Sequence, residues 1–484
     1  MTLDAESCYR AVASRDSRFA GRFVVAVATT GVYCRPGCPA RLPKRTNCSF
    51  FACAAAAETE GFRPCRRCRP DAAPGSPAAA GTSSTVRRAL RLIEGGALDD
   101  AGLPALAERV GVSPRHLVRL FREHLGASPS DVARTRRVHF ARKLLEETAL
   151  PMPRVAEAAG FASVRSFNHA VKGTFAAPPR ALRRRGRSED GRPEPTLVLR
   201  LPFREPLDWA ALLGFLARRC VPGVELVSGG RYVRTVGSPS GARGWIAVGP
   251  PARRAVPLEV PSALGPSLLA IAGRVSRLLD LSADPAEIAR HLRADPLLAP
   301  LVEARPGLRI PGTWDPFEAA VRALLGQQVS VAAGRTLVGR LAARCGARVE
   351  GAPEGLTTLF PDPAAVAGLS PEGLGLPAAR ARALLALARA ARDATLPLTP
   401  EADPGAVVSG LAALDGIGPW TAAYVSLRSL ADPDAFPAGD LVLRKALGSP
   451  SGPLTPRQAE QRAEPWRPFR AYAALHLWTA ATKE

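Results

Sequence analysis

The segment LDGIGPWTA, residues 414–422, decides the fold of the largest part of this chain. Two glycines flank an apolar residue, which predicts a tight hairpin between two helices whose backbone can approach a phosphate closely. The helix that follows offers N–H groups and the positive end of its dipole to the same anion. A hairpin of this kind also occurs as a plain structural turn, so the residues around it decide its meaning.

A Pro/Gly-rich loop, DPDAFPAGD at residues 432–440, ends in Asp440, 22 residues after Gly418. Hairpin, loop and acid together resemble the helix-hairpin-helix superfamily of base-excision DNA glycosylases. The resemblance is to the AlkA type, 3-methyladenine DNA glycosylase II, over residues 196–482. It implies that Asp440 is the catalytic carboxylate, which stabilises positive charge on the sugar as the N-glycosidic bond breaks. Asp440 could equally be the N-cap of a helix beginning at Leu441, and both roles can hold at once.

The resemblance also implies a base pocket formed by Trp420, Tyr424 and Trp478, in which a cationic alkylated purine would stack. From spacing alone, each of these residues could be a core aromatic. Residues 322–330 (RALLGQQVS) match the loop that props the duplex open when a base flips, with Gln328 at the wedge position. The DNA contacts implied in this half are Gln327, Gln328, Gly416, Gly418 and Thr421.

The chemistry expected of this half is hydrolysis without strand cleavage. Bifunctional relatives place a Schiff-base lysine just after the hairpin, where this chain has Trp420. The lysines of this half, Lys445 and Lys483, lie outside the hairpin. No cysteine follows Cys345, so the iron–sulfur cluster of some relatives cannot form.

Four cysteines near the N-terminus have the spacing of a zinc site. Cys34 and Cys38 form a C-x3-C pair, and Cys65 and Cys68 form a C-x2-C pair 26 residues later. Two such pairs can turn four sulfurs toward one tetrahedral ion, and a closed structural site is the ordinary outcome. Cys48 and Cys53, which lie between the pairs, are expected not to be ligands because the outer four complete the shell.

The segments TTGVYCRPGC (residues 29–38) and GFRPCRRC (residues 61–68) resemble the N-terminal domain of Ada-type DNA repair proteins. The resemblance implies that a zinc-bound thiolate accepts a methyl group from a methylphosphotriester in DNA, and that Cys34 is the acceptor. The spacing itself does not distinguish Cys34 from its partners. A bound thiolate stays deprotonated and nucleophilic at neutral pH. Its methylation removes one negative charge, which should strengthen binding to phosphates.

The middle of the chain has a helix-turn-helix pattern twice. Helices are predicted at residues 103–110 and 114–125, with Ser113 as N-cap, and again at residues 155–159 and 164–175. Helix pairs with glycine turns are common, but two units joined by a long helix at residues 129–147 resemble an AraC-type DNA-binding domain over residues 85–184. The candidate major-groove residues are Arg115, His116, Arg119 and Arg122 in the first unit and Arg165, Asn168 and Lys172 in the second.

Composition supports a nucleic-acid partner. The chain of 484 residues has a net charge of +22, of which residues 1–193 carry +16 (33 basic, 17 acidic) and residues 194–484 carry +6 (32 basic, 26 acidic). No run of eighteen apolar residues and no secretory signal is visible, and the odd number of cysteines, nine, favours a reducing cytoplasm.

Two Pro/Gly/Ser-rich or polar segments, residues 71–84 and 186–195, read as linkers. The predicted domains are a zinc module (residues 1–75), an AraC-type domain (84–186), an AlkA-type N-terminal α+β subdomain (196–283) and a helix-hairpin-helix glycosylase domain (284–484). Strands are expected at residues 196–201, 232–236 and 245–248, and a helix at residues 209–219. The fold class is therefore multidomain α+β, with an all-α second module and a mostly helical C-terminal domain.

The predicted function is DNA alkylation repair combined with regulation. The front half would bind double-stranded promoter DNA and contact RNA polymerase as an activator, and the back half would excise alkylated bases; a monomer is expected. The Pro-Cys-His-Arg motif of alkylguanine methyltransferases is absent, so reversal of O6-alkylguanine is not expected. Two alternatives remain open. One is a regulator with an inactive C-terminal DNA-binding platform. The other is a repair enzyme whose front half only concentrates it on DNA.

Overall fold

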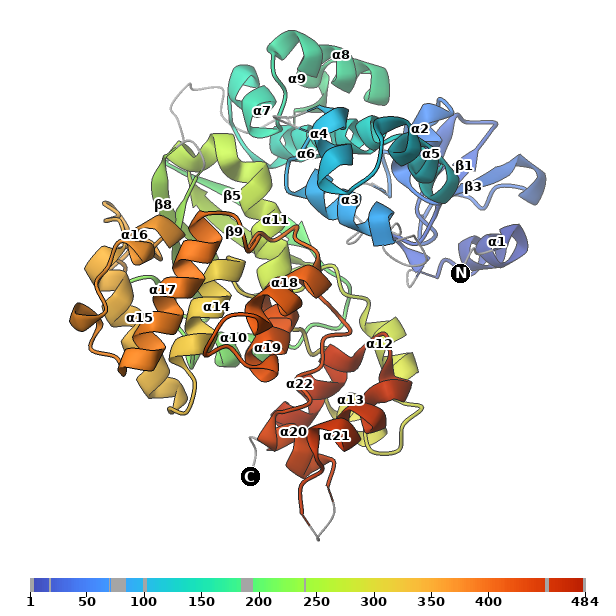
Figure 1. Cartoon of the computed structure of the whole chain (residues 1–484). Coiled ribbons are helices and arrows are strands. Elements are labelled where there is room, and N and C mark those ends of the chain that lie inside the picture. The colour runs from blue at the N-terminus through green and yellow to red at the C-terminus, as the bar shows by residue number, and fades with distance from the viewer. Residues whose placement is uncertain are drawn as a thin grey trace. The chain divides into compact units, whose positions relative to one another are not determined.

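The computed structural model describes residues 4–16, 19–68, 70, 84–98, 102–183, 195–238, 241–448 and 452–481. The chain divides into two compact units, residues 1–203 with 258–273 and residues 204–257 with 274–484 (Figure 1). Apart from Ser84 and Pro195, the two predicted linkers lie outside the described residues.

The first unit begins with a small α+β module. Helix α1 (Ala5–Ala13) precedes a four-stranded sheet of order β3-β1-β2-β4. The sheet contains β1 (Val24–Val27), β2 (Val32–Cys34), β3 (Cys48–Phe51) and β4 (Arg63–Pro64), with α2 (Ala54–Thr59) before the last strand. Strand β1 is antiparallel to β2 and β3, whereas β2 runs parallel to β4.

The helical module that follows agrees closely with the sequence pattern. Its helices are α3 (Ser84–Glu94), α4 (Leu103–Arg109), α5 (Pro114–Leu125), α6 (Pro129–Glu147), α7 (Met152–Ala158), α8 (Val164–Phe175) and α9 (Pro179–Leu182). Ser113 caps α5 by accepting from the His116 amide, as its sequence position predicts. Leu106, Leu117 and Phe121 are wholly buried where α4 and α5 pack together.

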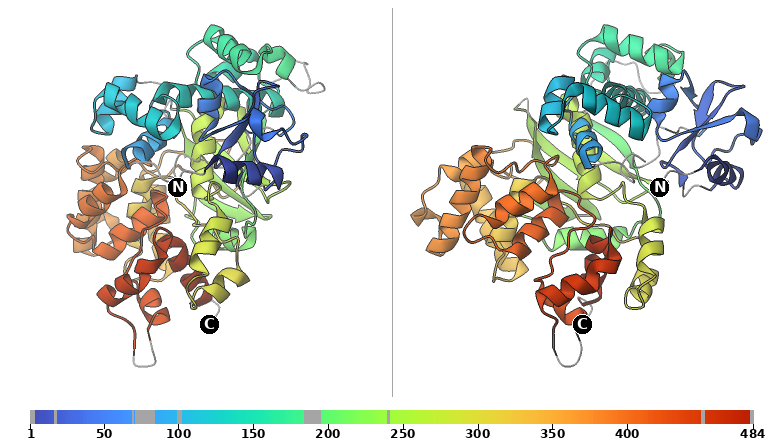
Figure 2. Two further views of the ribbon diagram at one scale, coloured as in Figure 1. Left: turned by 90° about the vertical axis from the view of Figure 1, so that its right-hand side faces the viewer. Right: turned by 45° about the vertical axis from the view of Figure 1, so that its right-hand side comes forward.

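A second sheet has the strand order β5-β9-β8-β7-β6. Its strands are β5 (Thr196–Pro202), β6 (Glu225–Ser228), β7 (Arg231–Gly237), β8 (Arg243–Val248) and β9 (Ala255–Pro261), and α10 (Trp209–Ala217) follows β5 along the chain. Within the second unit, β7 pairs antiparallel with both β6 and β8, and Figure 2 draws these strands in green. The strands expected at β5, β7 and β8 are present; β6 and β9 were not expected, because one is very short and the other contains two prolines.

A mostly helical domain was predicted over residues 284–484, and the described elements from residue 268 onward are helical. They are α11 (Leu268–Leu278), α12 (Pro285–Leu292), α13 (Ala299–Ala304), α14 (Pro316–Leu325), α15 (Val331–Cys345), α16 (Pro363–Ala367), α17 (Ala378–Arg392), α18 (Pro404–Ala412), α19 (Pro419–Ser429), α20 (Leu441–Ala446), α21 (Pro456–Ala463) and α22 (Arg470–Ala481). Short 3-10 turns occur at Arg45–Asn47, Ser262–Ser267, Glu372–Leu374 and Glu464–Trp466. The predicted fold class is thereby confirmed.

A buried ionic network ties the second sheet to α14, the helix that leads into the predicted wedge loop. Arg234 of β7 donates to Glu318 of α14 over 2.9 Å, and Arg322 donates to both Glu318 and Glu225 over 2.8 and 3.0 Å. Two acids thus balance two guanidinium groups, and such a buried network is tolerated only because its charges are paired and hydrogen-bonded. The network fixes the start of the loop that holds Gln327 and Gln328.

None of the helices in the described part of the chain is long and apolar enough to span a bilayer.

Candidate active sites and DNA-binding surfaces

Asp440 lies at the N-cap of α20, where its Oδ1 accepts from the amide of Leu443 over 3.0 Å. Two indole N–H groups also point at this carboxylate. Trp478 donates to Oδ1 over 3.1 Å and Trp420 donates to Oδ2 over 3.0 Å. The N-cap role is therefore observed. Since Oδ1 has two of these donors and Oδ2 has one, Oδ2 keeps acceptor capacity for a further partner.

The three pocket candidates of the sequence analysis lie together around Asp440. The rings of Trp420 and Tyr424 are stacked, with centroids 5.2 Å apart and planes 13° apart. Trp478 meets Tyr424 edge-on at 6.4 Å. All three rings and Asp440 are half-buried, so the group presents both aromatic surface and a carboxylate to solvent. Such a group can stack against a planar cation and balance its charge.

Arginines behind Tyr424 were not singled out from the sequence. Arg428 donates to the Tyr424 hydroxyl over 2.5 Å and is otherwise bonded to the carbonyls of Pro311 and Gly312. Burial alone would raise the pKa of Tyr424, but the positive charges of Arg428, Arg219 and Arg322 together outweigh burial and hold the pKa of the phenol below its ordinary value. The only sequence signal was the position of Arg428 four residues after Tyr424 on one helix.

The predicted hairpin is present between α18 and α19. Gly416 has φ +86°, and an added Cβ would lie 2.9 Å from the Ala383 Cβ, so this position requires glycine for two reasons. Gly418 is the N-cap of α19, and Pro419 is the first residue of that helix. The Gln327 side chain donates to the Gly416 carbonyl over 3.1 Å and to the Thr421 hydroxyl over 3.0 Å. The predicted wedge loop and the hairpin are thus joined through Gln327.

Gln328 is exposed and has φ +56°, a left-handed conformation that is uncommon for a residue other than glycine. Large apolar side chains nearby in sequence are also exposed: Val331 is 50% exposed, and Leu441 and Val442, which follow Asp440, are 52% and 42% exposed. Leu441 and Val442 thus place exposed apolar side chains directly after Asp440, and clustered exposed apolar residues are typical of a surface that meets a partner.

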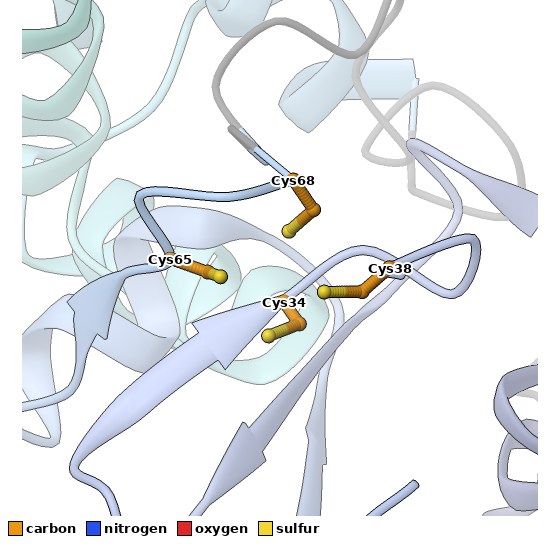
Figure 3. A group of neighbouring side chains, drawn as sticks. All are labelled: Cys34, Cys38, Cys65 and Cys68. Atoms are coloured by element: carbon orange, nitrogen blue, oxygen red, sulfur yellow. The ribbon is translucent and has the colours of Figure 1, made fainter. Parts of the chain in front are cut away.

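The four predicted zinc ligands converge in the first unit, and Figure 3 shows their side chains directed toward one another. The parallel register of β2 and β4 pairs Tyr33 with Pro64, so Cys34 and Cys65 follow side by side. All four sulfurs lie within 4.8 Å of one another. A tetrahedral zinc–thiolate site needs sulfurs about 3.8 Å apart, which follows from Zn–S bonds of about 2.3 Å. The donor set and its spacing therefore fit zinc.

The thiols perturb one another strongly. A hydrogen bond with Cys34 lowers the pKa of Cys68 to about 6, and the same bond, together with burial, raises the pKa of Cys34. Thiols this close together cannot all ionise, because their negative charges would repel. A bound divalent cation removes that repulsion and allows all of them to be thiolates. Cys48 and Cys53 lie outside the cluster, as expected, and donate to the carbonyls of Lys44 and Leu125. Arg66 and Arg67, between the second pair of ligands, are exposed and form a basic rim.

The helix-turn-helix candidates lie on exposed helix faces. On α5, Arg115, Arg119 and Arg122 are exposed, and an open groove runs along this helix. On α8, Arg165, Asn168 and Lys172 are exposed. The opposite faces of both helices are buried, so each helix presents a polar surface on its outer side.

Three family models match the chain in the order that the modules predict. The metal binding domain of Ada matches residues 7–71, a helix-turn-helix domain matches residues 106–185, and the AlkA N-terminal domain matches residues 198–315. The probable bifunctional transcriptional activator/DNA repair enzyme AlkA of Mycobacterium tuberculosis is 45% identical over 98% of this chain and 96% of its own length. The chain belongs to this family of bifunctional AlkA proteins. The site in the first unit accordingly holds one zinc ion.

Two further comparisons concern the C-terminal part. DNA-3-methyladenine glycosylase 2 of Escherichia coli is 38% identical over 57% of this chain and 95% of its own length. The 3-methyladenine DNA-glycosylase from Archaeoglobus fulgidus superposes with a TM-score of 0.51 at 23% identity, covering 57% of this chain and 96% of that structure. At that identity the superposition establishes the fold.

Proposed function

We propose that this chain is a DNA alkylation repair and response protein with two chemistries. It is a DNA glycosylase that excises alkylated bases such as 3-methyladenine, and it accepts methyl groups from DNA methylphosphotriesters through a zinc-bound cysteine. It also binds DNA through its helix-turn-helix domain as a transcriptional regulator. The observation that carries the proposal for the glycosylase site is the pair of indole donors, Trp420 and Trp478, on Asp440.

In the glycosylase reaction the Asp440 carboxylate would act on the sugar. Its two indole bonds orient it, and the remaining acceptor capacity of Oδ2 faces C1′ or the attacking water. As the cationic base leaves as a neutral purine with the electron pair of the N-glycosidic bond, the carboxylate stabilises the positive sugar. Water then adds at C1′ and gives its proton to the Asp440 carboxylate, which passes it to solvent. An alkylated purine is already cationic, so a stacking pocket and one carboxylate suffice. Trp420 stands where lyases have lysine, so the product is an intact abasic strand.

Base release from alkylated duplex DNA tests this assignment. Asp440→Asn keeps an N-cap side chain, so the variant should fold. We expect release of 3-methyladenine to fall about 10²-fold or more. Asp415→Asn, an exposed acid in the same hairpin, is the matched control and should retain full activity. An Asp440→Asn variant as active as the control would contradict the assignment.

In the methyl transfer the Cys34 sulfur would attack the methyl carbon of a methylphosphotriester. A sulfur–carbon bond forms, the carbon–oxygen bond breaks, and the phosphodiester anion leaves with the electron pair. Bound zinc keeps the thiolates deprotonated at neutral pH. The basic rim of Arg66 and Arg67 would hold the neighbouring phosphates. Each chain reacts once, because nothing in the step regenerates the thiolate.

Mass spectrometry of the chain after incubation with methylphosphotriester DNA tests the acceptor. We expect the methyl group on Cys34, and no methylation in Cys34→Ser. Cys48→Ser, which alters a cysteine outside the cluster, should react as the unsubstituted chain does. A methyl group found on Cys38, Cys65 or Cys68 in the unsubstituted chain would move the acceptor role away from Cys34.

The alternative of a regulator with an inactive C-terminal half is disfavoured by the detail of the second site. An unused platform has no need to aim two indole donors at a half-exposed carboxylate beside stacked rings. We further propose that the protein acts as a monomer in the cytoplasm, contacts RNA polymerase when it activates transcription, and reads DNA through Arg115, Arg119, Arg165 and Asn168.

A further inference from the structure

A carboxylate buried within the first unit joins the zinc module to the helix-turn-helix domain. Glu58, on α2, accepts from the Tyr33 hydroxyl over 2.9 Å and from the Thr135 hydroxyl over 2.7 Å. The ring Nε2 of His139 lies 2.7 Å from the same carboxylate and 3.3 Å from the Tyr33 oxygen. The side chains of Glu58 and His139 are only 6% and 11% exposed, and Tyr33 is fully buried.

The apolar contact beside this cluster is made mainly of small side chains. Ala55 and Ala56 of α2 pack against Ala127, with half-buried Phe51, Cys53 and Val132 around them. Such contacts are not directional, so by themselves they favour no single orientation strongly. Directional hydrogen bonds to a buried carboxylate cannot slide without leaving a polar group unpaired, which is costly. Glu58 therefore helps to set the angle at which the two modules meet, beside the hydrogen bond from the Cys53 thiol to the Leu125 carbonyl.

The cluster reaches functional groups on both sides. Tyr33 directly precedes Cys34 in β2, so one hydroxyl of the network is carried by the strand that holds the methyl acceptor. On the other side, the His139 ring meets Phe175 edge-on at 5.8 Å, and Phe175 is the last residue of α8. Helix α6, which carries Thr135 and His139, packs against both α2 and α8.

We propose that Glu58 and His139 are positioning residues that couple methyl acceptance at Cys34 to DNA binding by the helix-turn-helix domain. A fixed angle lets one duplex engage both modules at once, so that a phosphotriester is presented to Cys34 at a high effective concentration. If the contact between the modules were flexible, Cys34 could still accept a methyl group and the helix-turn-helix domain could still bind DNA, but not together on one duplex. The inference rests on the proposed function of Cys34.

The test compares two methyl donors with the full-length, zinc-loaded chain. One is a short duplex with a single methylphosphotriester. The other is a dinucleotide with the same phosphotriester, which is too short to engage a recognition helix. For Glu58→Gln we expect the rate constant on subsaturating duplex to fall about tenfold, since coupling between sites is typically 5- to 150-fold. The rate constant on the dinucleotide should change by less than about twofold, because that donor gains nothing from the coupling.

Two further variants complete the design. Glu60→Gln alters an exposed carboxylate at the end of the same helix and should react normally with both donors. His139→Phe keeps a ring against Phe175 but cannot bind Glu58, and it should reproduce the duplex-specific loss if Glu58→Gln does not fold. Zinc content is measured for every variant.

The outcomes separate the inference from the function on which it rests. A fall in the rate constant that is restricted to the duplex donor supports the proposed coupling through Glu58 and His139. An equal loss on both donors, or no loss on either, in a variant that folds and binds zinc would overturn it. If the unsubstituted chain takes a methyl group from neither donor, the acceptor role of Cys34 fails instead.

Discussion

At the scale of the residue, the two indole N–H groups that donate to Asp440 fix the orientation of its carboxylate more closely than its position in the loop does. A hydrogen bond to a charged group contributes about 1.5–3 kcal/mol, and here such bonds also fix the direction of the carboxylate. The sequence indicated Trp420 and Trp478 as stacking rings. Their N–H groups could not be assigned from spacing, because α22 and α19 meet only in the folded chain.

We therefore predict that Trp478→Phe, which keeps an aromatic ring but removes the donor, lowers the rate of base release about tenfold or more. Affinity for the alkylated duplex should change little, since stacking surface remains. Single-turnover kinetics at saturating enzyme measure this. Trp245→Phe, on β8, serves as the control for loss of an indole. A Trp478→Phe variant with an unchanged single-turnover rate would show that the bond to Asp440 does not contribute to the reaction.

At the scale of the element, the hairpin depends on one glycine more than on the other. Gly416→Ala meets both a positive φ and the Ala383 methyl, so we predict a destabilisation of about 1–3 kcal/mol. Gly418 has φ −82° and open space around an added Cβ, so Gly418→Ala should cost less than about 1 kcal/mol, the cap preference alone. Urea unfolding followed by tryptophan fluorescence compares them; equal losses would contradict the geometry.

The exposed arginines of helices α5 and α8 lead to a prediction about how DNA affinity depends on salt concentration. If Arg119 and Arg165 each neutralise one phosphate, replacing both by Gln should reduce the slope of log Kobs against log salt by about 2, since each contact contributes about 0.9. Fluorescence anisotropy with unmodified duplex DNA measures the slope. Replacing Arg154 and Arg218 by Gln, which removes the same charge elsewhere, should leave the slope nearly unchanged. An unaltered slope in the variant that lacks Arg119 and Arg165 would show that these two side chains do not contact DNA phosphates.

Sequence patterns identified some elements and not others, for physical reasons. The helices α5, α6 and α8 begin and end where predicted because apolar periodicity and Ser caps act locally. The strands of the zinc module contain two to four residues, too few to show a period, and were not predicted. The spacing of the four cysteines predicted the cluster that the structure assembles. The catalytic role of Asp440 was implied by the resemblance of its loop and stays a prediction. The contacts of Arg428 with Tyr424 and of His139 with Glu58 depend on packing and leave no pattern in the sequence.

At the scale of the whole molecule, the two units can be followed separately. All six tryptophans lie in the second unit, so their fluorescence reports that unit alone. His476, on α22, is buried, and burial lowers its pKa from 6.5 to about 4. Between these values the unfolded chain binds a proton that the folded chain does not, so stability falls as pH falls from 6.5 to 4.

We predict that His476 contributes about 3 kcal/mol to this loss. In His476→Gln, whose amide can still donate but does not titrate, the unfolding free energy of the second unit should depend less steeply on pH in this window. His169→Gln, exposed on α8, should keep the original dependence. Urea unfolding at a series of pH values provides the measurement, and identical slopes in all three proteins would argue against a buried neutral imidazole.

The cysteine cluster and the Asp440 site share no residue, so one site can be used up while the other stays active. In the proposed function, the thiolate would be consumed by its first lesion, whereas the carboxylate would emerge from each excision unchanged. One chain would then record a single exposure permanently and continue to clear lesions afterwards. The number of methylated chains would measure how much damage the cell has met, while the repair capacity for bases would remain that of the whole population.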